Sequence, residues 1–165
     1  MSPAINPATE VGTPSPREIM VTRVFNAPAK LVFDAHTKPE LVKRWLYGPE
    51  DWRMEVCEID LRVGGQYRYV WRNPEKGDMG MGGSFREIEA PTRLVTTELF
   101  DEDWTEGETV VTTTFEEKNG RTTVTYVVLY SSERARDGAL KTPMMEGWSM
   151  GLDRLEEVLT DMAQG

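Results

Sequence analysis

Six strand-like segments follow one another through the middle of the chain, and they constrain the fold more than any other feature. The segments are rich in β-branched and aromatic residues and cover residues 52–60, 65–73, 82–88, 93–100, 109–118 and 121–130. Short turn-forming stretches separate them, and Asn119-Gly120, between two segments rich in valine and threonine, favours a type I′ hairpin. Because parallel neighbours need long crossovers, the strands are expected to be mostly antiparallel. The absence of βαβ repeats excludes the doubly wound nucleotide-binding folds.

Before this run, the sequence predicts one more strand and two short helices. Residues 18–25 are rich in β-branched and apolar side chains, which is typical of a strand. Asn26 is expected to cap the first short helix. A second short helix is predicted over residues 40–46, ending before Gly48-Pro49.

After the run, apolar residues recur at intervals of four and three, as in an amphipathic helix. They are Trp148, Leu152, Leu155, Leu159 and Met162. The helix is predicted over residues 143–163 and would be about 30 Å long, enough to cross the concave face of a seven-stranded sheet. We therefore expect an α+β fold in which a curved, seven-stranded antiparallel sheet wraps around a long C-terminal helix. Residues 1–16 contain four prolines and are expected to form a disordered arm, and residues 17–165 a single domain.

Charge and composition exclude several classes of function. The chain carries 19 basic and 28 acidic residues, a net charge of -9, so most of its surface would repel a nucleic-acid backbone. No apolar run approaches the roughly 18 residues of a membrane span, and the N-terminus lacks a secretory pattern, so a cytoplasmic protein is expected. Cys57 and His36 are single residues of their types, so neither an intrachain disulfide, a metal centre nor a cofactor is predicted.

The curvature of the sheet predicts a cavity beside the long helix. A straight helix touches a twisted sheet along only part of its length, so the remaining gap must be filled by bulky side chains or stay open. Tyr67, Tyr69 and Trp71 alternate onto one face of their segment and are assigned to the inside, as is Phe115. Most of these aromatics are expected to be ordinary core. However, tyrosine and tryptophan carry a polar atom that needs a partner once buried, which favours a ligand site for some of them.

The N-terminal half of the long helix is predicted to face these aromatics. Met144 is an adaptable side chain and Trp148 an amphipathic one. Gly151 lies within the helix, where glycine costs about 1 kcal/mol relative to alanine. Close packing against the sheet and space for a ligand would each explain this glycine, and both interpretations remain open.

One predicted strand can be placed with either face inward. Leu94 and Phe100 favour one face, whereas Val95 and Leu99 favour the other. If the first pair faces inward, so does Glu98, and burial would raise the pKa of its carboxyl. The pattern slightly favours the alternative, a solvated Glu98 on the outer face of the sheet.

Several local sequences, in this order, resemble the helix-grip (START-like, SRPBCC) superfamily. They lie at residues 24–28 (VFNAP), 32–35 (VFDA), 39–45 (PELVKRW), 60–70 (DLRVGGQYRYV), 86–95 (REIEAPTRLV), 146–148 (EGW) and 152–155 (LDRL). Within the superfamily, the chain looks like the bacterial branch related to the C-terminal domain of the activator of the heat-shock protein 90 ATPase. The resemblance covers about residues 17–163 and rests on turns, helix caps and aromatics. It implies a cavity for a hydrophobic small molecule, without a fixed cofactor or catalytic triad.

Three functional hypotheses follow. The first is binding of a hydrophobic or aromatic small molecule by Trp45, Tyr67, Tyr69, Trp71, Phe85, Glu98, Phe115, Met144, Trp148, Gly151 and Leu152. The second is an enzyme, a polyketide cyclase or hydrolase, although no catalytic constellation is recognisable. The third is a chaperone-regulator or stress-related interaction domain. Among the proteins that the chain resembles, the chaperone role belongs to a two-domain protein in which the corresponding domain is the C-terminal half. Both a monomer and a homodimer are compatible with the sequence.

Overall fold

A computed structural model describes residues 9–47 and 51–164 of the chain. The strands of this described part are β1 (Thr9–Gly12), β2 (Glu18–Phe25), β3 (Arg53–Ile59), β4 (Gln66–Asn73), β5 (Gly77–Glu89), β6 (Arg93–Phe100), β7 (Thr109–Lys118) and β8 (Arg121–Leu129). The helices are α1 (Ala29–Thr37), α2 (Pro39–Val42), α3 (Glu133–Leu140) and α4 (Met144–Gln164).

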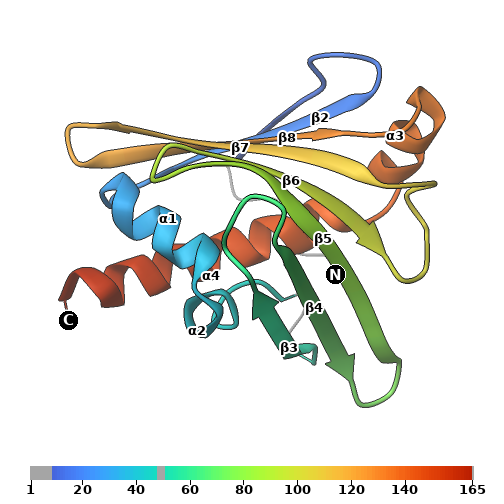
Figure 1. The fold of residues 1–165 in the computed structure, drawn as a ribbon, viewed down its shortest axis with the longest axis horizontal. Coiled ribbons are helices and arrows are strands. Elements are labelled where there is room, and N and C mark those ends of the chain that lie inside the picture. Colours follow the sequence, from blue (N-terminus) through green and yellow to red (C-terminus); the bar gives the residue numbers. More distant parts are fainter. Residues whose placement is uncertain (1–8, 48–50, 165) are drawn as a thin grey trace.

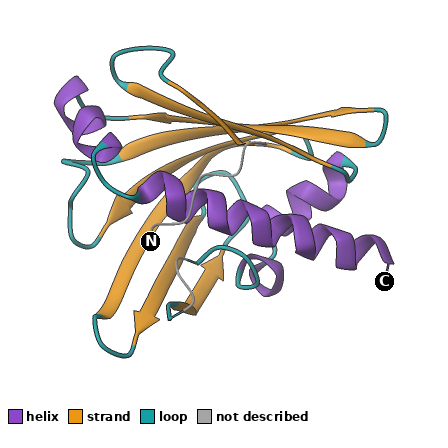
Figure 2. Cartoon of the chain, turned by 180° about the vertical axis from the view of Figure 1, so that it is seen from behind, coloured by secondary structure: helices purple, strands orange, loops and turns teal. Residues whose placement is uncertain are grey.

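The strands of the described residues form one antiparallel, eight-stranded sheet in the order β1-β2-β8-β7-β6-β5-β4-β3. The sheet is strongly curved, and α4 runs along its concave side (Figures 1 and 2). The expected α+β architecture is therefore confirmed, with one strand more than predicted. None of the helices in the described residues has the length and apolar character needed to cross a membrane.

The β7–β8 hairpin has the turn that its sequence predicts. Asn119 and Gly120 both have positive φ, 55° and 76°, as a type I′ turn requires. Lys118 and Arg121 are paired on either side of the turn. The resulting register puts Phe115 opposite Val124, and both side chains are buried on the inner face.

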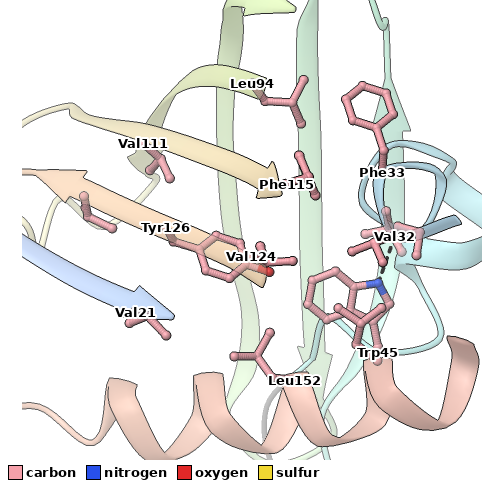
Figure 3. Close-up of a cluster of buried hydrophobic side chains, with 14 of the residues drawn as sticks. Val21, Val32, Phe33, Trp45, Leu94, Val111, Phe115, Val124, Tyr126 and Leu152 are labelled. Carbon is pink, nitrogen blue, oxygen red and sulfur yellow. Dashed lines mark hydrogen bonds between the residues drawn. The ribbon is translucent and has the colours of Figure 1, made fainter. Parts of the chain in front are cut away.

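The core fills one end of the concave side. There α1 packs between α4 and the strands β7 and β8, and Figure 3 shows Val32 and Phe33 of α1 beside Phe115 and above Leu152 of α4. Within this end, Val32 and, in the C-terminal half of α4, Leu155 are completely buried. The C-terminal half of α4 is thus ordinary core.

Ion pairs and a cation–π contact fix α4 to the rest of the domain. The wholly buried guanidinium of Arg23 in β2 donates to Asp153 at 2.6 Å and to Glu156 at 3.3 Å. On another side of the helix, Arg154 donates to the carbonyl of Tyr47 at 2.6 Å and lies over the ring of the same tyrosine. These contacts hold the helix at two positions across its width.

The structure differs from the predictions at the N-terminal side. Thr9–Gly12, within the expected arm of residues 1–16, forms β1 and pairs with β2; residues 1–8 lie outside the described part, as do Gly48 and Pro49. The first helix begins after Pro28 rather than Asn26, and its first amide, that of Ala29, donates to Glu117 of β7 at 2.7 Å. The helix start is therefore capped from a distant strand.

Two helical segments also differ from expectation. The second short helix, expected over residues 40–46, is limited to Pro39–Val42, and the chain continues through Trp45 in tighter turns. A helix that the sequence analysis did not predict, α3, is capped by Ser132, whose hydroxyl accepts from the Ala135 amide at 3.0 Å. Its composition is mostly polar, so no apolar pattern marks it.

Candidate functional site

A cavity of about 490 Å³ lies between the concave face of the sheet and the N-terminal half of α4. Its walls come from β4 to β8, from α4, from the ends of α1 and α2, and from the segments that follow α2 and β6. Met79 and Trp104 line it and are each 40% exposed, so they mark where it opens to solvent. A volume of this size falls in the range of small-molecule sites.

Nine of the eleven residues predicted from the sequence lie around this cavity. They are Trp45, Tyr67, Tyr69, Trp71, Phe85, Glu98, Met144, Trp148 and Gly151. Phe115 and Leu152 are not among its lining residues. Both belong to the solid core, because α1 covers this end of β7 and the Phe33 ring packs edge-on against Phe115 at 5.5 Å.

Backbone carbonyls bind the polar atoms of three of the wall aromatics. The Tyr67 hydroxyl donates to Thr97 O at 2.6 Å. The Trp71 indole N–H donates to the carbonyl of Leu46 at 2.7 Å, and that of Trp45 to the carbonyl of Ala35 at 2.9 Å. Each ring is therefore held in one orientation and turns apolar surface toward the cavity.

His36 and Tyr126 form a hydrogen-bonded pair in the cavity wall. The carbonyl of Val32 can only accept, so Nδ1 of His36 carries the proton of their 2.8 Å hydrogen bond. Nε2 therefore accepts from the Tyr126 hydroxyl, at 2.5 Å. Burial lowers the pKa of His36 to about 4 and raises that of Tyr126 well above its usual range. Near neutral pH both groups are uncharged, and both nitrogens of the imidazole are occupied.

Glu98 faces the cavity, so the slight preference for an outward, solvated Glu98 is wrong. Leu94, Thr96 and Phe100 line the same cavity, whereas Leu99 on the other face is 44% exposed. The inward set thus follows the two-residue period of the strand. Burial raises the pKa of the Glu98 carboxyl to about 7.

Close packing accounts for Gly151. A Cβ at this position would lie 3.2 Å from the carbonyl oxygen of Trp45, closer than side chains normally come to backbone. Because Gly151 also lines the cavity, the close approach of Trp45 and the shape of the cavity depend on the same residue.

The loop after β6 contributes to the opening of the cavity. Trp104 packs on Phe100, with ring centroids 5.0 Å apart. The loop is fixed by Asp103, which accepts from the Gly107 amide at 2.7 Å, and by Asp101, which binds Arg68 through both carboxylate oxygens. Trp104 therefore lies where the cavity opens to solvent.

The wall formed by the start of β5 was not predicted from the sequence. The strand was expected to begin at residue 82, whereas β5 begins at Gly77, and Met79 and Met81 line the cavity. Glycine has a low strand propensity and hides the strand signal here. The two methionines alternate with Gly80, and this two-residue period is the signal that could have identified them.

Comparison with known proteins identifies the family. Residues 26–160 match the family described as Activator of Hsp90 ATPase homolog 1-like protein. The chain belongs to this family. Its fold is accordingly the helix grip of the START-like superfamily, as the resemblance implied.

Solved structures agree with the AHSA1-like assignment. A protein from Rhodobacter sphaeroides is 30% identical over 93% of this chain and 99% of its own, with a TM-score of 0.88. One from Mycobacterium smegmatis is 26% identical over 93% and 97% of the two chains, with a TM-score of 0.80. An AHSA1-like protein from Aeromonas hydrophila, 21% identical over 88% and 95%, has a TM-score of 0.68 and shares the fold. No curated protein matches the chain.

The AHSA1-like cavity has a simple chemical character. Aromatic and aliphatic surface makes up most of its wall, and the ionisable groups among the described lining residues are Glu98, His36 and tyrosine hydroxyls. Within the described part of the chain, no three histidine, cysteine or acidic side chains are grouped so that they could hold a metal ion. The arrangement can enclose an apolar molecule and offer it one carboxyl group.

Proposed function

We propose that this AHSA1-like domain binds a hydrophobic or aromatic small molecule in the cavity beneath α4. The observation that carries the proposal is a cavity of about 490 Å³ in which three of the wall aromatics are fixed by hydrogen bonds to backbone carbonyls. Protein interiors are otherwise close-packed, and side chains around an empty space lose dispersion contacts. A cavity with such walls is better explained by an occupant than by defective packing.

Binding is a better explanation of these residues than catalysis. A general base works best when its pKa lies near the working pH, whereas the pKa of His36 is about 4. The imidazole also has both nitrogens engaged, by Val32 and Tyr126. Glu98 has a more suitable pKa, about 7, but no second acid or base is hydrogen-bonded to its carboxyl in the described residues.

A cavity-filling substitution tests the proposal. Val111 lines the cavity, and Val111→Phe adds an aromatic ring to the space a ligand would occupy. Val110→Phe is the matched control, because this neighbouring side chain lies on the opposite face of β7. We expect binding of neutral apolar probes such as decan-2-one, measured by isothermal titration calorimetry, to weaken at least about tenfold in Val111→Phe only.

The same pair of variants can be examined after purification from the native host. Native mass spectrometry is expected to show a co-purified small molecule with the parent protein and with Val110→Phe, but not with Val111→Phe. If the parent protein binds no apolar probe and carries no co-purified mass, the cavity is not a binding site. Equal probe binding by the two variants would also contradict the proposal.

A further inference from the structure

The cavity contains one carboxyl group and no cation to balance it. Glu98 is the acidic residue among the described lining residues, and no lysine or arginine is among them. Its backbone carbonyl accepts from the Thr109 hydroxyl at 3.4 Å, whereas its carboxyl has no hydrogen-bond partner in the described part of the chain. An ionised carboxylate in such a place is costly unless something pairs with it.

Two of the tyrosine hydroxyls near Glu98 are hydrogen-bonded to other groups. On β4, the Tyr67 hydroxyl donates to the carbonyl of Thr97. After β8, the Tyr130 hydroxyl donates to the sulfur of Met144. The carboxylate raises the pKa of Tyr67, Tyr69 and Tyr130 electrostatically, in addition to the larger effect of burial, so all three tyrosines lie in its field. None of them carries a positive charge.

We propose that the cavity takes a hydrophobic cation, an amine or a quaternary ammonium compound, with its charged head at Glu98 and its apolar body against the aromatic walls. This inference rests on the proposed function and adds the chemical class of the ligand. The head group would compensate the Glu98 carboxylate. It would also lie among tyrosine faces, which attract cations through their ring quadrupoles.

The mouth of the cavity favours the same class of ligand. Residues 101–108 contain five acidic side chains and no basic one, and Trp104 of this loop lines the cavity. Arginines from elsewhere pair with Asp101, Glu106 and Glu108. The whole chain has a net charge of -9, so its field draws cations and repels anions such as fatty acids.

The pH dependence distinguishes a cation from the main alternative, a carbonyl compound that accepts a hydrogen bond from protonated Glu98. A cation needs the ionised carboxylate, so its affinity rises with pH through a Glu98 pKa of about 7. A carbonyl ligand needs the protonated form, so its affinity falls over the same range. His36, with a pKa of about 4, stays neutral from pH 5.5 to 8.5, so its titration does not contribute to the change in affinity over this range.

The test uses two probes with similar chains and different heads. Decyltrimethylammonium has a permanent charge, and decan-2-one is neutral; both are titrated calorimetrically into the protein at pH 5.5 and pH 8.5, below micellar concentrations. At pH 5.5 only about 3% of Glu98 is ionised for a pKa of about 7, so the dissociation constant of the cation should fall about 30-fold at pH 8.5.

Two variants complete the experiment. Glu98→Gln should weaken cation binding at pH 8.5 by about tenfold or more and abolish its pH dependence. Glu116→Gln removes the same charge from an exposed position of β7 outside the cavity lining and should bind as the parent protein does. The parent protein's pH profile gives the answer independently if Glu98→Gln does not fold.

Three outcomes would overturn the inference without contradicting the proposed function. Cation binding could be independent of pH in the parent protein, or unchanged in Glu98→Gln. Alternatively, decan-2-one could bind more tightly at pH 5.5 and the cation not at all, which would make Glu98 a proton donor while the cavity remained a binding site. If neither probe binds at either pH, the proposed function fails together with the inference.

Discussion

Two partly buried titratable residues, His36 and Glu98, affect stability in opposite directions as the pH changes. The unfolded chain protonates His36 at its ordinary pKa of 6.5, but the folded protein only near 4, so stability is lost as the pH falls from 6.5 to 4. Glu98 keeps its proton up to about pH 7 in the folded protein but releases it near 4.5 when unfolded. Its contribution is therefore lost as the pH rises from 4.5 to 7.

Because the two effects oppose each other, the pH dependence of the free energy of unfolding should become visible only when one of the two residues is replaced. In the parent protein the two effects largely cancel between pH 4.5 and 6.5. In Glu98→Gln, the free energy of unfolding should rise with pH across this window, by up to about 1.4 kcal/mol per pH unit. In His36→Gln, it should fall with pH by a similar amount. Urea unfolding at several pH values measures both slopes, and identical slopes in the two variants would contradict the assignment.

At the residue scale, sequence reasoning succeeded where a period decided the answer. The alternation of Tyr67, Tyr69 and Trp71 was sufficient to place them inside. Glu98 could not be placed in this way, because apolar residues occupy both faces of its strand. Whether Phe115 lies in the core or at the cavity depends on which helix covers the end of β7. The carbonyl partners of the wall aromatics come from residues that are distant in the sequence. Neither arrangement can be predicted from the local sequence.

At the scale of the elements, α4 is held by an ion-pair cluster in which the arginine is buried and its two carboxylate partners are largely exposed. Arg23 has no exposed side-chain surface, while the side chains of Asp153 and Glu156 are 48% and 56% exposed. If the arginine is removed, both carboxylates can turn to water. If the carboxylates are removed, the guanidinium stays buried without them.

The two sides of the cluster should therefore differ in cost. Arg23→Met is expected to lower the free energy of unfolding by about 1–3 kcal/mol, the loss of charge-assisted hydrogen bonds. The double variant Asp153→Ala, Glu156→Ala should cost about 3–5 kcal/mol, because a buried charge loses its compensation. Glu157→Ala, an exposed change on the same helix, serves as the control in urea unfolding. A greater loss in Arg23→Met would contradict this explanation.

At the element scale, strong local signals were reliable and weak ones were not. Asn119-Gly120 predicted its hairpin, and the apolar stripe predicted α4 to within a residue at each end. β1 is only four residues long and lies among prolines, and its stability comes from pairing with β2. α3 has little apolar surface of its own. Both elements are stabilised by their neighbours rather than by local preference.

At the scale of the whole molecule, the order of elements was enough to predict the fold class and a cavity, but not the size of that cavity. The succession of strand, short helices, strands and long helix determines which face is covered. The volume left under α4 depends on how far the sheet curves and on contacts such as that of Gly151 with Trp45. These are properties of the assembled molecule.

A filled cavity should be visible in the melting temperature of the intact protein. A ligand present at about 100 times its dissociation constant stabilises the folded state by about 2.7 kcal/mol, which is a shift of about 5–10 °C for a domain of this size. Protein purified from its native host should lose that increment after denaturation, removal of small molecules and refolding. Val111→Phe is expected to melt at the same temperature before and after this treatment.

The pairing of β2 with β8 joins segments that are separated by most of the chain. During translation, β2 leaves the ribosome long before the strand that will become its neighbour, and α4 follows later still. Until then the aromatic inner face of the sheet has no cover, so aggregation and proteolysis threaten mainly the nascent chain. The yield of this protein should consequently depend more on the rate of synthesis and the supply of chaperones than on the stability of the folded domain.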